Sequence, residues 1–133
     1  MNILITGGAG FLGRRLARAL LAKGQLSLAG AAAQELKKLT LADRVGVDDD
    51  PHLSGDARVK CLVGDLNDLL ARSTLPLEDV DLVFHLAAAV SGECEADFDL
   101  GMRSNFEATH GLLQACRRTG RKPTVVFASS LAV

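Results

Sequence analysis

Short apolar runs alternate along this chain with longer segments in which apolar side chains recur every three or four residues. The runs have the length and composition of β-strands, and they fall at residues 2–6, 38–42, 59–63, 81–85 and 124–128. Leu82, Val83 and Phe84 are apolar at successive positions, which is typical of strands covered by helices on both faces. We therefore predict an α/β fold: a Rossmann-type doubly wound parallel sheet of five strands in the order 3-2-1-4-5.

An amphipathic helix is expected directly after the first strand, ending at Lys23 and Gly24. Its side facing the sheet should carry Leu12, Leu16 and Leu20, and its outward side Arg14, Arg15 and Arg18. The alanine-rich residues 25–36 are interpreted as an insertion with a short helix before the second strand. Residues 47–55 predict a polar surface loop.

A long helix is predicted over residues 95–118. One stripe along it contains Phe98, Met102, Thr109, Leu112 and Cys116, and Asn105 falls in that stripe. Because a buried amide without partners costs about 1 to 3 kcal/mol, Asn105 should be bonded to backbone, water or ligand. A purely structural clamp on a neighbouring strand is the alternative to a role at a ligand.

Length and composition are those of one soluble globular domain, with 133 residues, 48% hydrophobic and 23% charged. The formal net charge is -1 and the basic residues are scattered, so we expect neither nucleic-acid binding nor a membrane-binding patch. No charged leader precedes an apolar stretch, and no apolar run approaches the ~20 residues that cross a bilayer. The expected location is the cytoplasm.

The cysteines lack the paired spacing of metal ligands. Cys61, Cys94 and Cys116 are therefore expected to be reduced and to serve as small buried apolar residues. Three consecutive acids at residues 48–50 precede a proline, a pattern that is more typical of a solvated turn than of a metal site. No metal cofactor is predicted.

The turn between the first strand and the first helix is rich in glycine, with the sequence Thr-Gly-Gly-Ala-Gly-Phe-Leu-Gly at residues 6–13. Gly8, Gly10 and Gly13 have the G-x-G-x-x-G spacing, and Gly7, Gly10 and Gly13 recur every third residue. Glycines here permit a sharp turn, a close approach of pyrophosphate to backbone amides and tight packing of helix on strand. The turn predicts a dinucleotide site, although such a turn can also serve backbone geometry alone.

Carboxylates follow the second and third strands. At Asp43, a carboxylate would accept hydrogen bonds from ribose hydroxyls and repel a 2′-phosphate, which favours NAD over NADP. Arg44 could instead pair with a 2′-phosphate, and Asp43 could be a plain turn residue. Asp65 would lie within reach of an adenine amine, or it could cap the next helix.

The fourth and fifth strands end in small or polar residues. His85 is expected to be a hydrogen-bonded core histidine rather than a catalytic base. The small residues 86–89 would leave room for ribose and nicotinamide, and Ser129 and Ser130 would lie near the nicotinamide end unless they only cap a turn.

Together, these motifs and their order resemble the N-terminal half of an extended short-chain dehydrogenase/reductase, the NAD-dependent epimerase/dehydratase family. The resemblance covers essentially the whole chain, and residues 89–101 look most like its D-erythronate dehydrogenase branch. It implies an NAD cofactor held at Gly7, Gly10, Phe11, Leu12, Gly13, Asp43, Asp65, Leu66, Leu86, Ala87, Ala88, Ala89 and Asn105. In that scheme Phe11 and Leu12 line the pyrophosphate, and Asp65 and Leu66 flank adenine. Ser130 helps to polarise the substrate oxygen, and Ser130 and Asn105 belong to the catalytic shell.

One feature of the family is missing. Its acid/base pair is a Tyr-x-x-x-Lys beyond the fifth strand, but this chain contains no tyrosine and stops at Val133. The resemblance thus implies a domain truncated after the fifth strand: the NAD-binding part of an oxidoreductase that transfers a hydride between a sugar or sugar-acid hydroxyl and NAD. Such a part is expected to be inactive alone. A nucleotide-sugar epimerase or dehydratase, a non-catalytic NAD(P)-binding sensor and a methyltransferase are the alternatives. Expected partners are the small-molecule substrate and a second copy in a homodimer.

Overall fold

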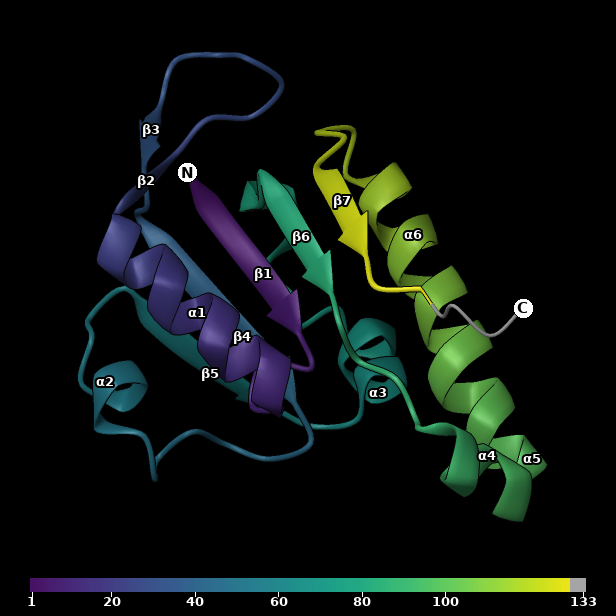
Figure 1. Ribbon diagram of the computed structural model, residues 1–133. Coiled ribbons are helices and arrows are strands. Elements are labelled where there is room, and N and C mark those ends of the chain that lie inside the picture. The colour runs from purple at the N-terminus through teal and green to yellow at the C-terminus, as the bar shows by residue number, and fades with distance from the viewer. Residues whose placement is uncertain (130–133) are drawn as a thin grey trace.

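The computed structural model, which describes residues 1–129, is built around a parallel sheet of five strands in the order β5-β4-β1-β6-β7 (Figure 1). The strands are β1 (Asn2–Thr6), β4 (Lys38–Asp43), β5 (Val59–Val63), β6 (Leu82–His85) and β7 (Thr124–Phe127). The predicted fold class and strand order are confirmed, because this order is 3-2-1-4-5 when the five strands are numbered along the chain.

Helices cover both faces of the sheet. Helix α1 (Phe11–Lys23) lies on one face, and α3 (Leu66–Ala71) and α6 (Ala108–Arg118) lie on the other (Figure 1). In β1, Ile3 and Ile5 belong to the core cluster beneath α1, whereas Leu4 belongs to the cluster with α3 and α6. Successive apolar residues are therefore buried on opposite sides, as the uninterrupted apolar runs predicted.

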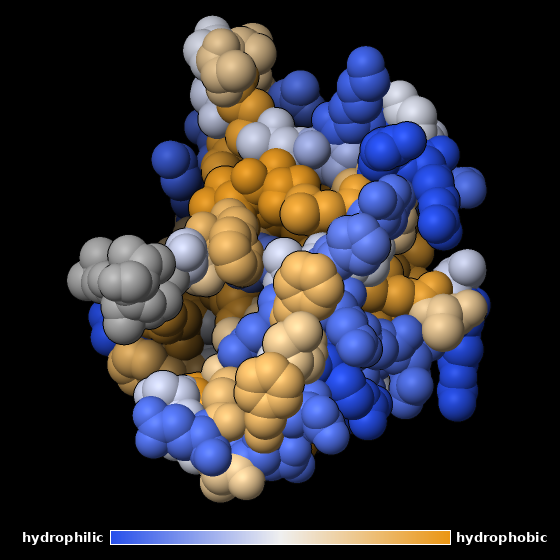
Figure 2. Space-filling model, turned by 90° about the vertical axis from the view of Figure 1, so that its right-hand side faces the viewer, coloured by the Kyte–Doolittle hydropathy of each residue, from blue (hydrophilic) through white to orange (hydrophobic). Residues whose placement is uncertain are grey.

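The β7 side of the sheet is less covered. Val126 and Phe127 of β7 and Leu113 of α6 are exposed, and Figure 2 shows apolar side chains on the surface of this side. A parallel edge strand with exposed apolar residues is a place where further chain can pack.

The buried side of helix α1 agrees with the predicted one at Leu20, which is buried, and at Leu16, which packs against the core, but not at Leu12. Gly13, Ala17, Leu20 and Leu21 are buried, whereas Leu12 is 63% exposed. The close packing of Gly13 against the preceding turn fixes the rotation of the helix, and Leu12 is turned away by about 100°. The predicted end of the helix is correct, because it finishes at Lys23.

The alanine-rich insertion contains no helix in the structure. Instead, β2 (Gln25–Leu26) pairs in an antiparallel ladder with β3 (Gln34–Glu35). Leu36 at the end of this hairpin is buried, and its N–H donates to the carbonyl of Gly24 at 2.8 Å. A helix this short would have little stability of its own even with many alanines. The burial of Leu36 and its hydrogen bond to Gly24 therefore determine the conformation of this segment.

The segment predicted as a polar loop is partly core. It contains the short helix α2 (Pro51–Ser54), and Val47 and Leu53 are buried in the cluster under α1. Asp50 is buried as well and accepts two hydrogen bonds from Arg18, at 3.1 and 2.6 Å. Two of the arginines expected to face away from the sheet, Arg14 and Arg18, therefore fasten α1 to this segment.

The predicted long helix is interrupted. The chain forms α4 (Ser91–Ala96), α5 (Phe98–Gly101), a π-helix η2 (Met102–Glu107) and then α6. Phe98 is 74% exposed and Met102 is also exposed, whereas Leu112 and Cys116 are buried. The single stripe was wrong because a π-helix has i→i+5 hydrogen bonds and takes up an extra residue, which shifts the phase of everything before it.

The cysteines differ in burial, and all three are free thiols. Cys116 is buried, and desolvation raises the pKa of its thiol, but Cys61 is exposed, contrary to expectation. Within the described residues, no group of three or more His, Cys, Asp or Glu side chains is arranged to hold a metal ion. No helix in this part of the chain is long and apolar enough to span a membrane.

Candidate cofactor-binding site

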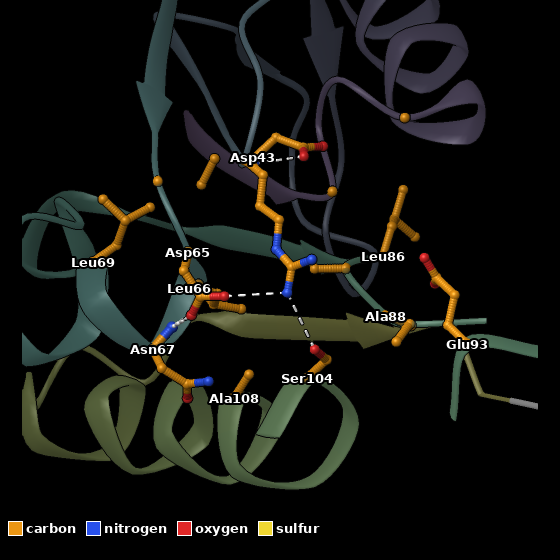
Figure 3. Close-up of a pocket in the computed structure, with 17 residues that line it drawn as sticks. Asp43, Asp65, Leu66, Asn67, Leu69, Leu86, Ala88, Glu93, Ser104 and Ala108 are labelled. Atoms are coloured by element: carbon orange, nitrogen blue, oxygen red, sulfur yellow. Dashed lines mark hydrogen bonds and ion pairs between the residues drawn. The ribbon is translucent and has the colours of Figure 1, made fainter. Parts of the chain in front are cut away.

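A cavity of about 320 Å³ opens at the carboxyl ends of β1, β4, β5 and β6 (Figure 3). Ligands bind at this edge in doubly wound sheets, where the strand order reverses. Of the residues predicted for the site, the cavity is lined by Gly7, Gly10, Asp43, Asp65, Leu66, Leu86, Ala87, Ala88 and Ala89. Phe11, Leu12, Gly13 and Asn105 do not line it.

The glycine-rich turn is built by close backbone contacts. Gly7 has a φ of 71°, and a Cβ there would lie 2.8 Å from the amide nitrogen of Ala87. A Cβ on Gly13 would overlap the carbonyl oxygen of Gly7 and the backbone of Gly8. Gly13 therefore acts behind the cavity, by letting α1 start directly against the turn.

The first turn of α1 presents unpaired backbone donors. Gly10 caps this helix without a side chain, and no acidic residue stands in the first turn. Within residues 1–129, the amides of Phe11, Leu12 and Gly13 donate to no protein acceptor. Free amides at the positive end of a helix dipole suit an anionic group such as a pyrophosphate, so the turn fits a dinucleotide.

Asp43 is held in a fixed orientation at the end of β4. Its Oδ2 accepts a hydrogen bond from the N–H of Ala9 at 2.9 Å, and its Oδ1 accepts one from the N–H of Arg44 at 2.7 Å. A carboxylate has about four acceptor sites, so lone pairs remain for two hydroxyl donors. The carboxylate is thus tied to the glycine-rich turn before any ligand arrives.

Asp65 and Arg44 meet across the cavity. Asp65 Oδ1 accepts from the N–H of Asn67 at 2.9 Å, which confirms the helix-cap alternative for this residue. Its Oδ2 lies 3.3 Å from Nη2 of Arg44, and the same Nη2 donates to Oγ of Ser104 at 3.4 Å (Figure 3). Arg44 thereby links the ends of β4 and β5 to the π-helix.

Asn105 holds the loop that follows β6. Its Oδ1 accepts from the N–H of Ala89 at 2.8 Å, and its Nδ2 donates to the Ala89 carbonyl at 3.1 Å and to Sγ of Cys94 at 3.5 Å. The amide is bonded to backbone, as predicted, but its side chain is exposed rather than buried, because the π-helix turns it out of the core stripe. Asn105 therefore affects the cavity only indirectly, by holding Ala89, which lines it.

His85 is a hydrogen-bonded core residue, as expected. Its Nδ1 lies 2.6 Å from Oγ1 of Thr6, its Nε2 lies 2.8 Å from Oγ1 of Thr109, and its ring stacks on Phe127. Burial lowers the pKa of its imidazole, so the neutral form is favoured. Both ring nitrogens are occupied, which leaves none for a substrate.

Several lining residues were not foreseen from the sequence: Ala42, Gly64, Asn67, Leu69, Glu93, Ser104 and Ala108. Asn67 and Leu69 follow directly from a helix that starts at Asp65, and Ser104 is the neighbour of Asn105, so a closer search around those positions would have found them. Nothing local marks Glu93, whose Oε2 accepts from the N–H of Val90 at 3.1 Å. Ser130, the predicted catalytic serine, lies outside the described residues.

This strand order, a glycine-rich turn after the first strand and carboxylates after the next two define a dinucleotide-binding domain of the Rossmann class. A family model specifies which one: the chain belongs to the NAD dependent epimerase/dehydratase family, whose model matches residues 3–133.

Known proteins similar to this chain agree with that assignment. D-erythronate dehydrogenase from Cupriavidus necator is 52% identical over 133 residues, which are 100% of this chain and 40% of the relative. The nucleoside-diphosphate-sugar epimerase from Agrobacterium tumefaciens superposes with a TM-score of 0.76 at 37% identity, covering 100% of this chain and 38% of that structure. MoeE5 in complex with UDP-glucose and NAD gives a TM-score of 0.70 at 28% identity, covering 100% and 38%. The chain thus spans about 40% of the length of the curated relative.

Proposed function

We propose that this chain binds NAD and is the cofactor-binding part of an oxidoreductase acting on a sugar acid of the D-erythronate kind. The observation that carries the cofactor half of the proposal is the first turn of α1, where free amides stand beside a carboxylate already oriented by Ala9. The substrate half is supported by the 52% identity to a D-erythronate dehydrogenase across the whole chain.

Each part of the site has a proposed task. The amides of Phe11, Leu12 and Gly13, beside the cavity, bind the pyrophosphate, and Gly7 and Gly10, which line the cavity, bring no side chain into it. Asp43 accepts the adenosine ribose hydroxyls, and Asp65 with Leu66 borders adenine. Leu86, Ala87, Ala88 and Ala89 border the nicotinamide half of the cofactor.

The reacting end of the site is assigned by family resemblance. NAD, when bound, supplies the hydride acceptor. Ser130 is proposed to donate a hydrogen bond to the substrate oxygen, and Asn105 to keep the Ala89 loop in place. We also propose that the chain is one part of a longer protein whose further residues supply the acid/base pair and the substrate pocket, which the 40% coverage of the relative supports.

Calorimetric titration with NAD and NADP tests the cofactor assignment directly. We expect NAD to bind to the folded chain with the higher affinity. A folded chain that binds neither nucleotide would refute the proposal. Production of NADH with D-erythronate, by this chain and by any longer protein that contains it, tests the reaction, and we expect activity only from the longer one.

A nucleotide-sugar epimerase is the second candidate, favoured by the 37% identity and TM-score of 0.76 to such an epimerase. The two candidates differ in their net reaction. A dehydrogenase accumulates NADH as it consumes substrate, whereas an epimerase returns the hydride and accumulates none. A protein that binds NAD and does neither, with erythronate or nucleotide sugars, would be the non-catalytic sensor.

A homodimer is also part of the proposal. The exposed apolar residues of η2, α6 and β7 include Phe106, Leu113, Val126 and Phe127. Figure 2 shows apolar side chains on the surface of one side of the molecule. Exposed apolar surface of this kind marks association sites. Sedimentation equilibrium should give twice the mass of the chain, and a single-chain mass at micromolar concentration would contradict the dimer.

A further inference from the structure

Arg14 connects the glycine-rich turn to a segment on the outside of the fold. Its Nε donates to the carbonyl oxygen of Ala9 at 2.7 Å, and its Nη2 donates to the Gly46 carbonyl at 3.3 Å and to Oδ1 of Asp49 at 2.8 Å. The arginine side chain is only 22% exposed, although the sequence pattern placed it on the outward side of α1. Its donors are thus used to hold backbone, not to face solvent.

Ala9 is held from both sides. Its carbonyl accepts from Arg14, and its N–H donates to Oδ2 of Asp43 at 2.9 Å. The next residue, Gly10, lines the cavity and caps α1. A continuous set of contacts therefore runs from Asp49 through Arg14 and Ala9 to Asp43.

We propose that Arg14 is a positioning residue for cofactor binding. By fixing the Ala9 carbonyl it holds the peptide plane between Ala9 and Gly10, and this limits the movement of the two neighbouring groups: the Ala9 N–H that binds Asp43, and the start of α1 at its cap Gly10. Binding groups held in place before the ligand arrives cost less ordering entropy on binding. The inference rests on the proposed NAD site.

The ion pair with Asp49 serves this role and contributes little else. The hydrogen bond from Arg14 lowers the pKa of the Asp49 carboxyl and raises the pKa of Arg14, so both groups stay charged around neutral pH. Asp49 is 74% exposed, and such pairs add little to stability. Removal of Arg14 should therefore change the turn more than the fold.

Arg18 is a matched control on the same helix. It lies one turn further along α1 and pairs with Asp50, but it makes no hydrogen bond to the glycine-rich turn. Asp50 is 2% exposed, and Arg18 is its ion-pair partner. Loss of Arg18 would leave a buried carboxylate unpaired. The stability of the fold should therefore fall, while the conformation of the glycine-rich turn should not change.

The test compares Arg14→Gln, Arg14→Lys and Arg18→Gln by calorimetric titration with NAD and with ADP-ribose, well below the melting temperature of each variant. We expect Arg14→Gln to lower the affinity for both ligands about tenfold, with a small change in Tm. Arg14→Lys keeps the charge but has no fork of donors for both Ala9 and Asp49, so it should show a similar loss. Arg18→Gln should lower Tm and leave affinity within about twofold.

The possible results distinguish failure of the proposed NAD-binding function from failure of the role of Arg14. If the unmodified chain binds neither ligand, the proposed function fails and this inference fails with it. If it binds both, but Arg14→Gln binds as tightly as the unmodified chain, only the role of Arg14 is refuted. The same holds if Arg14→Gln and Arg18→Gln lose affinity equally, because the loss would then follow fold stability. If Arg14→Lys binds as tightly as the unmodified chain and Arg14→Gln does not, the positive charge at this position matters and the donor geometry does not, which contradicts the positioning role.

Discussion

The side-chain amide of Asn105 pairs with both polar groups of the Ala89 backbone, accepting from its N–H at 2.8 Å and donating to its carbonyl at 3.1 Å. This two-point contact joins the π-helix to the loop after β6, whose first residue is bonded to β1 by the N–H of Leu86, which donates to the Thr6 carbonyl at 3.1 Å. Ala89 lines the cavity, so the shape of that wall depends on a residue that does not itself reach the ligand space.

Asn105→Asp should open this contact. An aspartate keeps the acceptor for the Ala89 N–H but presents a second oxygen to the Ala89 carbonyl, so one hydrogen bond becomes a repulsion. We expect about 1 to 2 kcal/mol lower stability in urea unfolding and about tenfold weaker NAD binding. Gln114→Glu, an amide-to-acid change at a half-buried position of α6 that does not line the cavity, is the control and should bind NAD normally.

Asp43→Asn should change the choice of nucleotide. The asparagine removes the negative charge that would repel a 2′-phosphate, and Arg44 beside it can then pair with that phosphate. We expect the ratio of NADP to NAD affinity to rise by about tenfold or more in calorimetric titrations. Asp48→Asn, an exposed acid that does not line the cavity, should leave the ratio unchanged. An unaltered ratio in Asp43→Asn would mean that this carboxylate does not contact the ribose.

Gly13→Ala should destabilise the fold. The added methyl group would overlap the Gly7 carbonyl and the Gly8 backbone, neither of which can move without shifting β1 or α1. We expect a loss of about 3 kcal/mol or more in the free energy of unfolding, the upper end for overpacking. Gly92→Ala, also helical but with open space around its Cβ, should be neutral or stabilising by about 0.5 to 1 kcal/mol. Equal stability of the two variants would show that the backbone of the glycine-rich turn can move to accommodate a methyl group at little cost in free energy.

His85 should make stability depend on pH. Burial holds its folded-state pKa below the ordinary value of 6.5, so the unfolded chain binds the extra proton first. The stability that the neutral ring contributes is complete above pH 6.5 and is lost as the pH falls below that value. Thermal melts between pH 7.5 and about 5 should show this decline.

His85→Gln should flatten that decline while lowering stability at neutral pH, because it removes the titrating ring and loosens the contacts with Thr6 and Thr109. His110→Gln, at an exposed histidine of α6, is the control for loss of a histidine side chain and should change the Tm at neutral pH little. A His85→Gln variant with the original slope would place the pH dependence on another group.

The sheet and the edge that carries the site were predictable because their signal is local. Each core strand is a short apolar run, and polar or small residues such as Asp43, Asp65 and Ala87 follow directly where the runs stop. In a parallel sheet those positions meet at one edge, so the pattern is enough to bring them together.

The remaining contacts depend on long-range packing that no local pattern contains. Arg44 and Ser104 are 60 residues apart, and Arg14 meets Asp49 across 35 residues. The apolar spacing from Phe98 to Cys116 fits a regular α-helix well, so it gave no warning of a π-helix. The burial of Val47 and Leu53 was missed because acidic neighbours dominate that stretch.

The π-helix between Met102 and Glu107 contains one residue more than an α-helix would need to connect α5 to α6. Deleting a single residue there would let the segment tighten into ordinary α-helix, and the residues before it would keep their orientation relative to α6, because the π-helix already takes up one extra residue. Phe98 would stay exposed, but the wide turn that presents Asn105 to Ala89 would close, and the pairing of these two residues would be lost. Relatives one residue shorter in this stretch should therefore lack the amide clamp and fasten the loop after β6 by other means.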